Sequence, residues 1–559
     1  MFDAAGAFEF DDAPEWLRRF AERKPHLLGV IGAPILVSTI DYLIAAGEPQ
    51  RQAHHALAGL RMMSSDLILD EIDSYEPLAP IAVLRLIVMA GLHGRNVVVS
   101  SATLAQPVAV AVWRAFAFGC ALGSTLRGEV PARQFNVAFL NDLIAPVVGR
   151  HADEAAFAAA YFAYGTSLSG ALAPTSAPAR PRYRVPELLP VDEAKPADWF
   201  SVIRQAAEAM HDRHGWRDEV SGKRLSFGLV RVANIGVAIR VAETLAGALP
   251  HARVACYHSG HFALQRYHIE LRLDQFLTRK HGDGMAHILQ DPDIRKILRG
   301  HSGPDIPLIV VATPVEEIGR DHDFDWAVIE PSSAQSIVQT AGRVNRHRLA
   351  DIDPTAPNVG ILQFNRKHIL RKALAFTRPG LETADHPYSS HDLGDLLNWS
   401  RLDAIDARLR FDHSAHPLAA QDDASINRAI SRPLARIFGN DNRGNLWMSL
   451  DTYVEAPLRD HDGIRLELTL QPNQDNTFSV VDDLIGAIGD RIIAPALPRV
   501  TNDWLSLDDT ELGELAADLG VDANQGLTVA LTSPSRDGDD VMNKVRRHRS
   551  FGFWLAATR

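Results

Sequence analysis

The sequence predicts an α/β protein with two successive parallel sheets, on the strength of three observations. Short apolar runs of strand character alternate with segments of helical periodicity in two series, over about residues 27–166 and 199–364. Such alternation is typical of strand–helix–strand units, whose strands pair in parallel. A Pro-rich segment separates the two series, and a C-terminal stretch of alternating apolar and polar residues follows them.

Composition places the chain among globular proteins. It has 559 residues, 46% of them hydrophobic and 23% charged, which suits about three domains. We find no membrane-length apolar run and no basic signal region, so we expect no membrane association. The two cysteines, Cys120 and Cys256, form neither a disulfide framework nor a metal-ligand pattern, which favours a reducing cytoplasmic compartment. The net charge of −12 argues against a general nucleic-acid coat protein but allows a local basic channel.

The first series contains three expected strands and two clear helices. The strands are Pro34–Asp41, Asp66–Leu69 and Asn96–Ser100, and the helices are Ala53–Met63 and Ile81–Gly91. Further helices are expected up to about residue 166. Residues 167–196 then carry six prolines among Ala and Ser, which excludes a regular helix interior and predicts an extended linker.

The second series is followed by polar helical segments. Its expected strands are Leu225–Val232, Arg253–Tyr257, Leu308–Ala312, Trp326–Glu330 and Gly360–Phe364. Candidate helices after Arg366 are His391–Leu397 and Arg401–Arg410. The alternating runs Leu446–Leu450 and Ile464–Leu470 suggest a small C-terminal domain of mixed character.

An acidic cluster, Asp70-Glu71-Ile72-Asp73, follows the second expected strand, and Ser101-Ala-Thr103 follows the third. In open α/β sheets, ligands bind at the carboxyl ends of the strands. Adjacent carboxylates there can hold Mg²⁺ and orient a water against a nucleotide γ-phosphate. Acidic loops after strands are also commonly only solvated, so the cluster alone leaves both interpretations open.

A second constellation, Gln339-x-x-Gly342-Arg343-x-x-Arg346, lies near the end of the second series. On a helix these four residues would share one face. The glycine permits close approach, and two guanidinium groups can meet a phosphate. A basic helix face in solvent is the alternative interpretation.

Together these motifs resemble a known family. The acidic cluster, Ser101-Ala-Thr103, Thr313…Glu317-x-Gly319-x-Asp321 and the Gln339–Arg346 pattern are similar to motifs II, III, V and VI of superfamily 2 helicases. Longer segments around these motifs resemble the helicase–nuclease of type I CRISPR systems, most closely the type I-F form, over about residues 27–410. These segments include Val37-Ser-Thr39-Ile-Asp41, Arg61–Asp73, Gly228–Ile235, Tyr257-His-Ser259 and Gly319–Trp326.

The resemblance implies tandem RecA-like domains, the first incomplete at its N-terminus, then a helical linker and a small C-terminal domain. The expected division is a first RecA-like domain over 1–170, a Pro-rich linker over 171–198, a second RecA-like domain over 199–380, a helical linker over 381–445 and an accessory domain over 446–559.

The resemblance also implies site residues and the cofactors ATP and Mg²⁺. Asp70 would hold the metal, Glu71 would act as base or water-orienter, and Arg343 and Arg346 would face the γ-phosphate. The implied nucleotide-binding residues are Glu317, Gly319, Asp321, Gln339 and Gly342. The implied coupling residues are Asp73, Ser101 and Thr103. The implied contacts to the DNA backbone are Thr39, Arg231, Asn234, His258 and Thr313.

The implied function is ATP-driven 3′-to-5′ translocation on single-stranded DNA during CRISPR interference. The implied partners are single-stranded DNA and a Cascade-type surveillance complex, and adaptation-complex proteins are a further partner that the resemblance allows. A different superfamily 2 motor, such as an RNA helicase, stays open as an alternative. So does a non-catalytic remnant that binds DNA or a protein partner.

One part of the pattern is missing. No Gly-x-x-x-x-Gly-Lys-Ser/Thr phosphate loop precedes the acidic cluster. The nearest match, Gly222-Lys223-Arg224, comes after the linker and has Arg224 in place of the hydroxyl residue. The family's HD nuclease domain has no counterpart either. We therefore expect a C-terminal portion of the family's protein, with little ATPase activity and no nuclease activity by itself.

Overall fold

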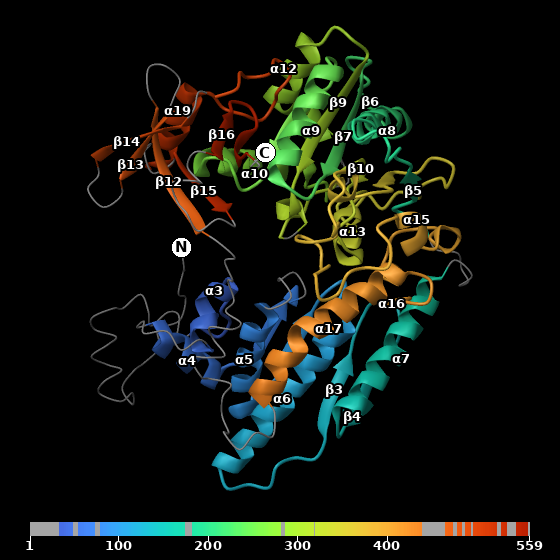
Figure 1. The fold of residues 1–559 in the computed structure, drawn as a ribbon, viewed down its shortest axis with the longest axis vertical. Coiled ribbons are helices and arrows are strands. Elements are labelled where there is room, and N and C mark those ends of the chain that lie inside the picture. Colours follow the sequence, from blue (N-terminus) through green and yellow to red (C-terminus); the bar gives the residue numbers. More distant parts are fainter. Residues whose placement is uncertain are drawn as a thin grey trace. The chain divides into compact units, whose positions relative to one another are not determined.

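The computed structural model of the chain describes residues 33–47, 54–72, 79–173, 181–280, 286–317, 319–438, 464–472, 478–482, 487–493, 496–521, 527–533 and 544–556. The chain forms two compact units, each described by itself (Figure 1): a first unit, Met1–Gly165 with Ile426–Asp460, and a second unit, Thr166–Ser425 with His461–Arg559. The C-terminal stretch thus falls in the same unit as the second series of strands. The five-part division expected from the sequence stays a prediction.

The first unit contains a small parallel sheet at the acidic cluster. β1 (Leu67–Asp70) pairs with β2 (Val97–Ser100), so that Asp70 lies opposite Ser100. α5 (Ala79–Leu92) connects the two strands, which confirms the predicted strand–helix–strand unit. The carboxyl ends of both strands therefore meet at one edge of this sheet.

α5 and α6 (Gln106–Leu126) pack together through glycines. A Cβ at Gly119 would lie 2.1 Å from the Val88 carbonyl oxygen, and a Cβ at Gly123 would lie 2.3 Å from that of Leu92. No larger residue fits such contacts. Among the described residues, α6 is also the one helix long and apolar enough to span a membrane by length and composition. Packing within the first unit buries part of this apolar helix.

A β-hairpin lies where only helices were expected. β3 (Phe135–Phe139) pairs antiparallel with β4 (Val147–His151) before α7 (Glu154–Leu172) begins. The helical prediction was wrong because the residues of β3 alternate between two faces, as a period of two requires. On one face the Phe139 ring lies 5.8 Å from the Phe157 ring.

The strand expected at Pro34–Asp41 is not formed. Residues 33–39 pair with no strand among the described residues, and α3 (Ile40–Leu43) begins directly after them. Ile35 and Val37 are each 83% exposed, so the apolar run does not mark a buried strand. The next elements are η1 (Ile44–Ala46) and α4 (His54–Ser64), the latter close to its expected position.

The second unit is built on a parallel sheet with the strand order β5-β11-β10-β7-β9-β8. In that order the strands are β5 (Pro186–Leu189), β11 (Val359–Leu362), β10 (Trp326–Ile329), β7 (Arg224–Arg231), β9 (Asp305–Ala312) and β8 (Arg253–Tyr257). A short β6 (Trp216–Arg217) pairs antiparallel with β7. All of these strands except β5 and β6 overlap a predicted strand, which confirms the second α/β series.

β5 corrects the expected linker. It lies inside the Pro-rich segment, yet it forms the sheet edge, with Pro186 opposite Val359 of β11. Proline is tolerated at the first residue of an edge strand, so the proline content excluded a helix but not a strand. In addition, α7 continues through Leu172, and residues 174–180 lie outside the described residues.

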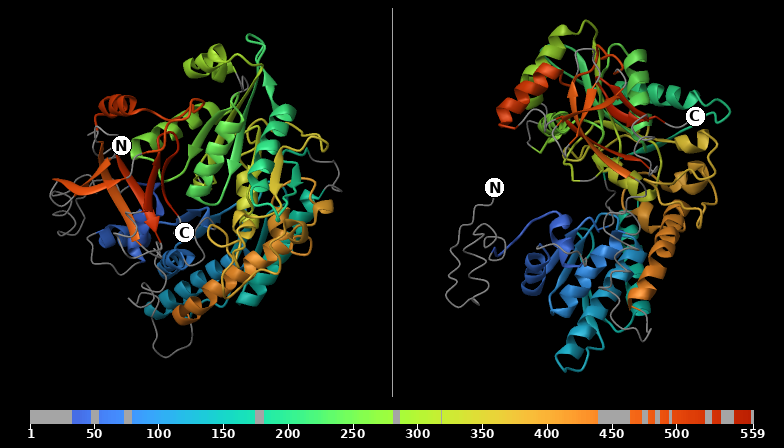
Figure 2. Two further views of the ribbon diagram at one scale, coloured as in Figure 1. Left: turned by 45° about the horizontal axis from the view of Figure 1, so that its top comes forward. Right: turned by 60° about the vertical axis from the view of Figure 1, so that its left-hand side comes forward.

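Helices cover both faces of this sheet (Figures 1 and 2). One face carries α8 (Asp198–His214) and α9 (Ile235–Ala248), and the other carries α10 (Ala263–Leu277), α11 (Ala286–Gln290), α12 (Pro292–Gly300) and α13 (Ala334–Ala341). The successive residues Leu229 and Val230 of β7 are both fully buried, one in each core. Such a continuous apolar strand is typical of a parallel sheet covered on both sides.

Short helices follow the sheet where longer ones were expected. They are α14 (Arg366–Ile369), α15 (Leu393–Leu396), η4 (Trp399–Arg401) and α16 (Arg408–Phe411), before the long α17 (Pro417–Phe438). The Asp392 carboxylate accepts from the Gly394 N–H, and the Asp406 carboxylate accepts from the Arg408 N–H. Local side-chain bonds of this kind favour turns over continuous helix.

The C-terminal stretch is of mixed character, as predicted. Its elements are β12 (Ile464–Pro472), β13 (Phe478–Asp482), β14 (Ala487–Ile493), α19 (Asp509–Leu519), β15 (Thr528–Ser533), β16 (Val545–His548) and β17 (Gly552–Leu555). Strands β14-β13-β12-β15 form an antiparallel sheet, and Leu470 of this sheet shares a core with Leu264 of α10. The alternating run Leu446–Leu450 lies outside the described residues.

Candidate functional site

The acidic cluster of the first unit follows β1. Asp70 is the last residue of that strand and is exposed. Glu71 has φ +51, a left-handed conformation that is uncommon for residues other than glycine and is often found at functional sites. Its N–H donates to the Ser100 carbonyl at 2.8 Å, which holds the cluster at the end of β2. Asp73 lies outside the described residues.

The other predicted residues of the first unit lie in well-defined places. The Ser101 hydroxyl accepts from the Thr103 N–H at 2.9 Å, and Thr103 is fully buried. Thr39 is exposed and precedes α3. Arg61 donates to the Ala33 carbonyl at 2.6 Å and thereby holds the segment that leads to Thr39. The coupling and DNA-contact roles of these residues stay predictions.

In the second unit, Glu317 bonds to three parts of the chain through its side chain and its main-chain carbonyl. Its Oε1 accepts from Arg231 Nε at 2.5 Å, from the Ser336 hydroxyl at 2.7 Å and from the Thr340 hydroxyl at 3.3 Å. Its carbonyl accepts from Arg343 Nη2 at 2.6 Å. Glu317 therefore joins the end of β7 to α13 and to the residues that follow α13.

Arg231 is a correction to the sequence-based assignment. Its side chain is fully buried, and it also donates to the Glu330 carbonyl and to the Ser332 hydroxyl, at 2.8 and 3.0 Å. A side chain with all these internal partners does not reach a DNA backbone. Its role is to pair with Glu317 inside the protein.

Sequence reasoning missed Glu330 at the same sheet edge. Its buried carboxylate accepts from the Ala233 and Arg366 N–H groups, at 2.6 and 2.7 Å. Burial raises the pKa of Glu330. The sequence did contain an indication of this residue, since Glu330 is the last residue of an expected apolar strand, at the sheet edge where ligands were predicted to bind. Ser332 and Ser336 were missed as well, because nothing in their sequence spacing marks them.

The expected shared helix face is wrong for three of its four residues. α13 ends at Ala341, so Gln339 lies on the helix, whereas Gly342, Arg343 and Arg346 lie in or beyond its C-cap. Arg343 is only 2% exposed. Gly342 is the C-cap of the helix, and three residues later Asn345 turns the chain with φ +49.

Asp321 and Arg346 form an ion pair. Asp321 Oδ1 is 3.0 Å from Arg346 Nε and 2.9 Å from His347 Nε2, and Lys280 also pairs with this carboxylate. Burial would raise the pKa of Asp321, but the hydrogen bonds from Lys280 and His347 lower it to about 2. The Arg346 side chain is 39% exposed. Gly319 precedes this group in a left-handed conformation, φ +66.

The predicted DNA contacts of the second unit differ in exposure. Asn234 is exposed at the start of α9. Thr313 is 5% exposed, and its N–H donates to the Tyr257 carbonyl at 3.2 Å. His258 is fully buried, with Nε2 2.7 Å from the Phe551 carbonyl, and burial lowers its pKa to about 4. The assignment of His258 to a DNA surface is therefore corrected: it anchors the C-terminal hairpin.

Lys223, in the nearest match to a phosphate loop, forms hydrogen bonds inside the protein. Lys223 donates to the carbonyls of Leu298 and His301, at the end of α12. Its ammonium group thus acts within the fold, in agreement with the interpretation of Gly222-Lys223-Arg224 as a chance match. Among the described residues, no three His, Cys, Asp or Glu side chains cluster in a way that suits a metal ion.

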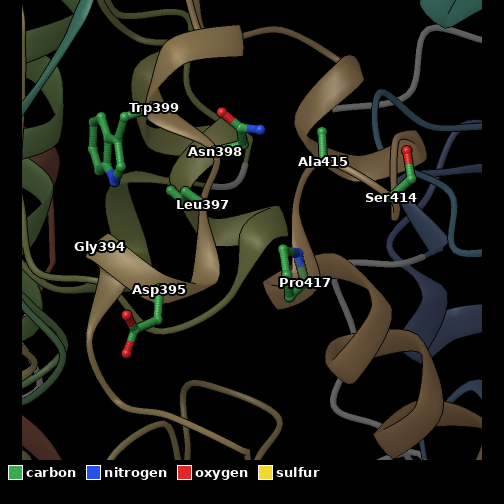
Figure 3. A pocket seen from close by; sticks show the side chains of 8 residues that line it. All are labelled: Gly394, Asp395, Leu397, Asn398, Trp399, Ser414, Ala415 and Pro417. Atoms are coloured by element: carbon green, nitrogen blue, oxygen red, sulfur yellow. The ribbon is translucent and has the colours of Figure 1, made fainter.

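One open recess lies elsewhere in the second unit and contains none of the predicted site residues. Figure 3 shows its lining, which comes from residues 394–399, in and after α15, and from residues 414–417, which lead into α17, around a volume of about 440 Å³. Its polar groups already have partners: Asp395 accepts from the Ser390 hydroxyl, and Trp399 Nε1 donates to the Leu393 carbonyl. The recess is therefore a structural feature of the segment after the sheet.

Comparison with known proteins connects the two units to one family. Residues 224–349 match the family model described as CRISPR-associated nuclease/helicase Cas3, C-terminal. The chain is 36% identical over 413 residues to Cas3 subtype I-F/YPEST of Pseudomonas aeruginosa, and 34% identical over 392 residues to that of Pectobacterium atrosepticum. These alignments cover 73% and 68% of the chain but only 37% and 35% of the relatives, so the chain spans about a third of their length.

Solved structures show the same fold. The crystal structure of T. fusca Cas3 matches with a TM-score of 0.51 and 17% identity, over 94% of this chain and 53% of that one. The structure of T. fusca Cas3 with ATP matches with a TM-score of 0.52 and 17% identity, over 96% and 54%. The α/β fold class predicted from the sequence is thereby confirmed.

Proposed function

Because the chain belongs to the Cas3 family of CRISPR-associated nuclease/helicases, we propose that it is part of an ATP-dependent motor that translocates 3′-to-5′ on single-stranded DNA during CRISPR interference. The observation that carries the proposal is two contacts in the second unit: the ion pair between Asp321 and Arg346, and the hydrogen bond from Arg343 to the Glu317 carbonyl. All four residues belong to the sequence motifs, and each pair is in contact in the structure. A chance basic helix would not give that arrangement.

The acidic cluster suits a Mg²⁺–nucleotide complex. Asp70 offers an exposed carboxylate at the carboxyl end of β1, and oxygen ligands of this kind are those that Mg²⁺ prefers. The metal would neutralise phosphate charge, with Asp70 as its protein ligand. Glu71 would orient the attacking water or accept its proton. The structure of T. fusca Cas3 with ATP, which shares the fold, supports the proposal that this chain binds a nucleotide.

Arg346 is the side chain best placed to meet the phosphates. It is partly exposed and held by Asp321, whereas Arg343 is buried against the Glu317 carbonyl. We assign γ-phosphate contact to Arg346 and support of that contact to Arg343. Gln339, Gly342 and Gly319 remain the proposed lining of the nucleotide site, and Asp73, Ser101 and Thr103 remain the proposed coupling residues.

Thr39, Asn234 and Thr313 remain as the proposed contacts to the DNA backbone. Hydroxyl and amide groups of this kind bind phosphate oxygens without reading the base sequence, which suits a motor. We further propose a Cascade-type surveillance complex as the partner in the bacterial cytoplasm, on the strength of the subtype I-F relatives. Adaptation-complex proteins are a second proposed partner.

Binding of a non-hydrolysable ATP analogue to the chain tests this proposal. We expect binding that depends on Mg²⁺ and falls about tenfold or more in D70N, because one charged ligand contact is lost. Single-stranded DNA should bind with the same affinity in both proteins. Tighter binding of RNA than of DNA of the same sequence would favour the RNA-helicase alternative, and absence of nucleotide binding would favour a non-catalytic remnant.

Two expectations about activity accompany the proposal. The chain by itself should show little DNA-stimulated ATP turnover, because its sequence has no lysine-bearing phosphate loop. It should also leave single-stranded DNA undegraded in the presence of divalent metals. Robust turnover or degradation that a single substitution in this chain abolishes would contradict these expectations.

A further inference from the structure

The segment that carries Arg346 is not held by a helix. α13 ends at Ala341, and four residues later Asn345 takes the left-handed conformation with φ +49. Asparagine visits this conformation readily, so Asn345 marks a turn in a segment that α13 does not hold. The position of Arg346 must therefore be set by contacts outside α13.

Asp323 supplies these contacts through three successive backbone groups. Its Oδ1 accepts from the Arg346 N–H at 3.0 Å, and its Oδ2 accepts from the His347 and Arg348 N–H groups at 3.1 and 3.3 Å. Successive N–H groups that converge on one anion form a concave binding site for it. Asp323 is fully buried, so each of these bonds is charge-assisted and shielded from water.

Arg348 completes the arrangement. Its Nη2 and Nε donate to Asp323 at 2.8 and 3.1 Å, and its Nη1 donates to Asp325 at 2.5 Å. Arg279 pairs with Asp325 as well, at 2.8 Å. A buried carboxylate without a cation would be costly, and the guanidinium groups of Arg348 and Arg279 offset the two buried charges.

Two further hydrogen bonds fix the start of the segment. The Phe324 N–H donates to the Arg343 carbonyl at 2.8 Å, and the Asn345 N–H donates to the Phe324 carbonyl at 2.9 Å. The chain from Arg343 to Arg348 therefore lies along residues 323–325 and is bonded to them at almost every step.

We propose that Asp323 is a positioning residue for Arg346, because it binds the backbone from which the Arg346 guanidinium reaches the nucleotide. The inference rests on the proposed function, in which Arg346 contacts the γ-phosphate. Asp321 and Asp323 then have separate tasks. Asp321 pairs with the guanidinium, at 3.0 Å from Arg346 Nε, and Asp323 fixes the main chain below it.

The test compares D323N with D325N. Asp325 is a matched control, because it is also buried and also pairs with the Arg348 side chain, but it accepts no backbone N–H from residues 346–348. Hydrogen exchange of the amides of residues 346–348 is measured in the full chain. We expect exchange about tenfold or more faster in D323N, and a much smaller change at these amides in D325N.

The second measurement is the preference for a triphosphate. The affinities of AMPPNP and ADP are measured with Mg²⁺ for the wild type, D323N, D325N and R346A. In D323N and R346A the preference for AMPPNP over ADP should fall about tenfold, with ADP affinity nearly unchanged, because only the γ-phosphate contact is lost. If D323N does not fold, R348K gives a milder form of both tests, since lysine keeps the charge but not the paired bonds.

The outcomes separate the two proposals. Unchanged exchange of residues 346–348 in D323N would overturn the positioning role whatever the nucleotide result. Faster exchange with an unchanged preference for AMPPNP would overturn it too, and would leave Asp323 with a structural task alone. A wild-type chain that binds AMPPNP no better than ADP would contradict the proposed function, and with it the positioning role.

Discussion

The acidic edge of the first unit and the arginine-bearing edge of the second unit hold their side chains differently. Asp70 is exposed at the end of a two-stranded sheet, and Glu71 follows it in a left-handed conformation. In the second unit, Arg231 and Glu317 are buried and bonded to each other. The comparison teaches that a helicase motif contains residues that hold other residues, as well as residues that can meet a ligand.

Burial sorts the second-unit residues into these two classes. Arg231 and His258 point into the protein, and their partners are Glu317 and the Phe551 carbonyl. Asn234 is exposed and Arg346 is partly exposed. The following predictions change members of each class, from the largest expected effect to the smallest.

Arg231→Met should give the largest loss of stability. It removes one partner of a buried ion pair and leaves the Glu317 carboxylate unpaired, so the free energy of unfolding of the second unit should fall by about 3–5 kcal/mol. Urea unfolding measures the change, and Arg231→Lys, which keeps the charge, should lose less. If the free energy of unfolding fell by less than about 1 kcal/mol and DNA binding became weaker, Arg231 would be a DNA contact after all.

His322 should make the second unit less stable at alkaline pH. Burial would lower its pKa, but the Glu316 charge and hydrogen bonds to Asp274 and Glu316 raise it to about 9. The stabilisation is therefore complete below the unfolded pKa of about 6.5 and is lost as pH rises through about 9. Between pH 6 and 9 we expect a loss of about 2–3 kcal/mol, which His322→Gln should largely remove. An identical pH profile in the variant would contradict this assignment.

His258 should have the opposite pH dependence. Burial lowers its pKa to about 4, so its stabilisation is complete above the unfolded pKa of about 6.5 and declines as pH falls toward 4. At pH 5.5 the expected loss is about 1 kcal/mol. Hydrogen exchange of β16 and β17 should report it, because His258 bonds the Phe551 carbonyl between these strands. Acid-induced exchange that is fastest elsewhere in the second unit would argue against this anchor.

Asn234→Ala should have the smallest effect on stability, within about 0.5 kcal/mol, because the side chain is exposed and caps nothing. If Asn234 contacts the DNA backbone, the affinity for single-stranded DNA should fall about fivefold. Fluorescence anisotropy with a labelled oligonucleotide measures this change. Unchanged affinity would remove Asn234 from the DNA surface.

The fold of the second unit followed from its sequence more fully than the site did. Long apolar strands such as β7 and β9 were visible because a strand covered on both faces has no polar alternation. β5 was hidden by its prolines. The hairpin β3–β4 was hidden because its alternating residues lie between two helices rich in alanine.

The site residues could be named from motifs, but their orientation could not be derived. Arg231 is the last residue of β7, at the carboxyl end where a DNA contact would lie, and its partner Glu317 is 86 residues away in the sequence. No local pattern reports that pairing. Likewise, α13 ends at Ala341, with Gly342 as its C-cap and a turn at Asn345, whereas the spacing of the motif suggests a longer helix.

The central claim is that Arg346 acts on the nucleotide and not on DNA. The most direct test is the DNA-stimulated ATPase rate of R346A, in a motor that includes a phosphate loop, together with its affinity for single-stranded DNA. The account predicts a loss of turnover of about 10³–10⁵, with DNA affinity nearly intact, because an arginine that meets the γ-phosphate stabilises the transition state. Thr313→Ala should instead weaken DNA binding and retain turnover. Loss of DNA binding by R346A with an unchanged turnover number would contradict the account and place Arg346 in the DNA channel.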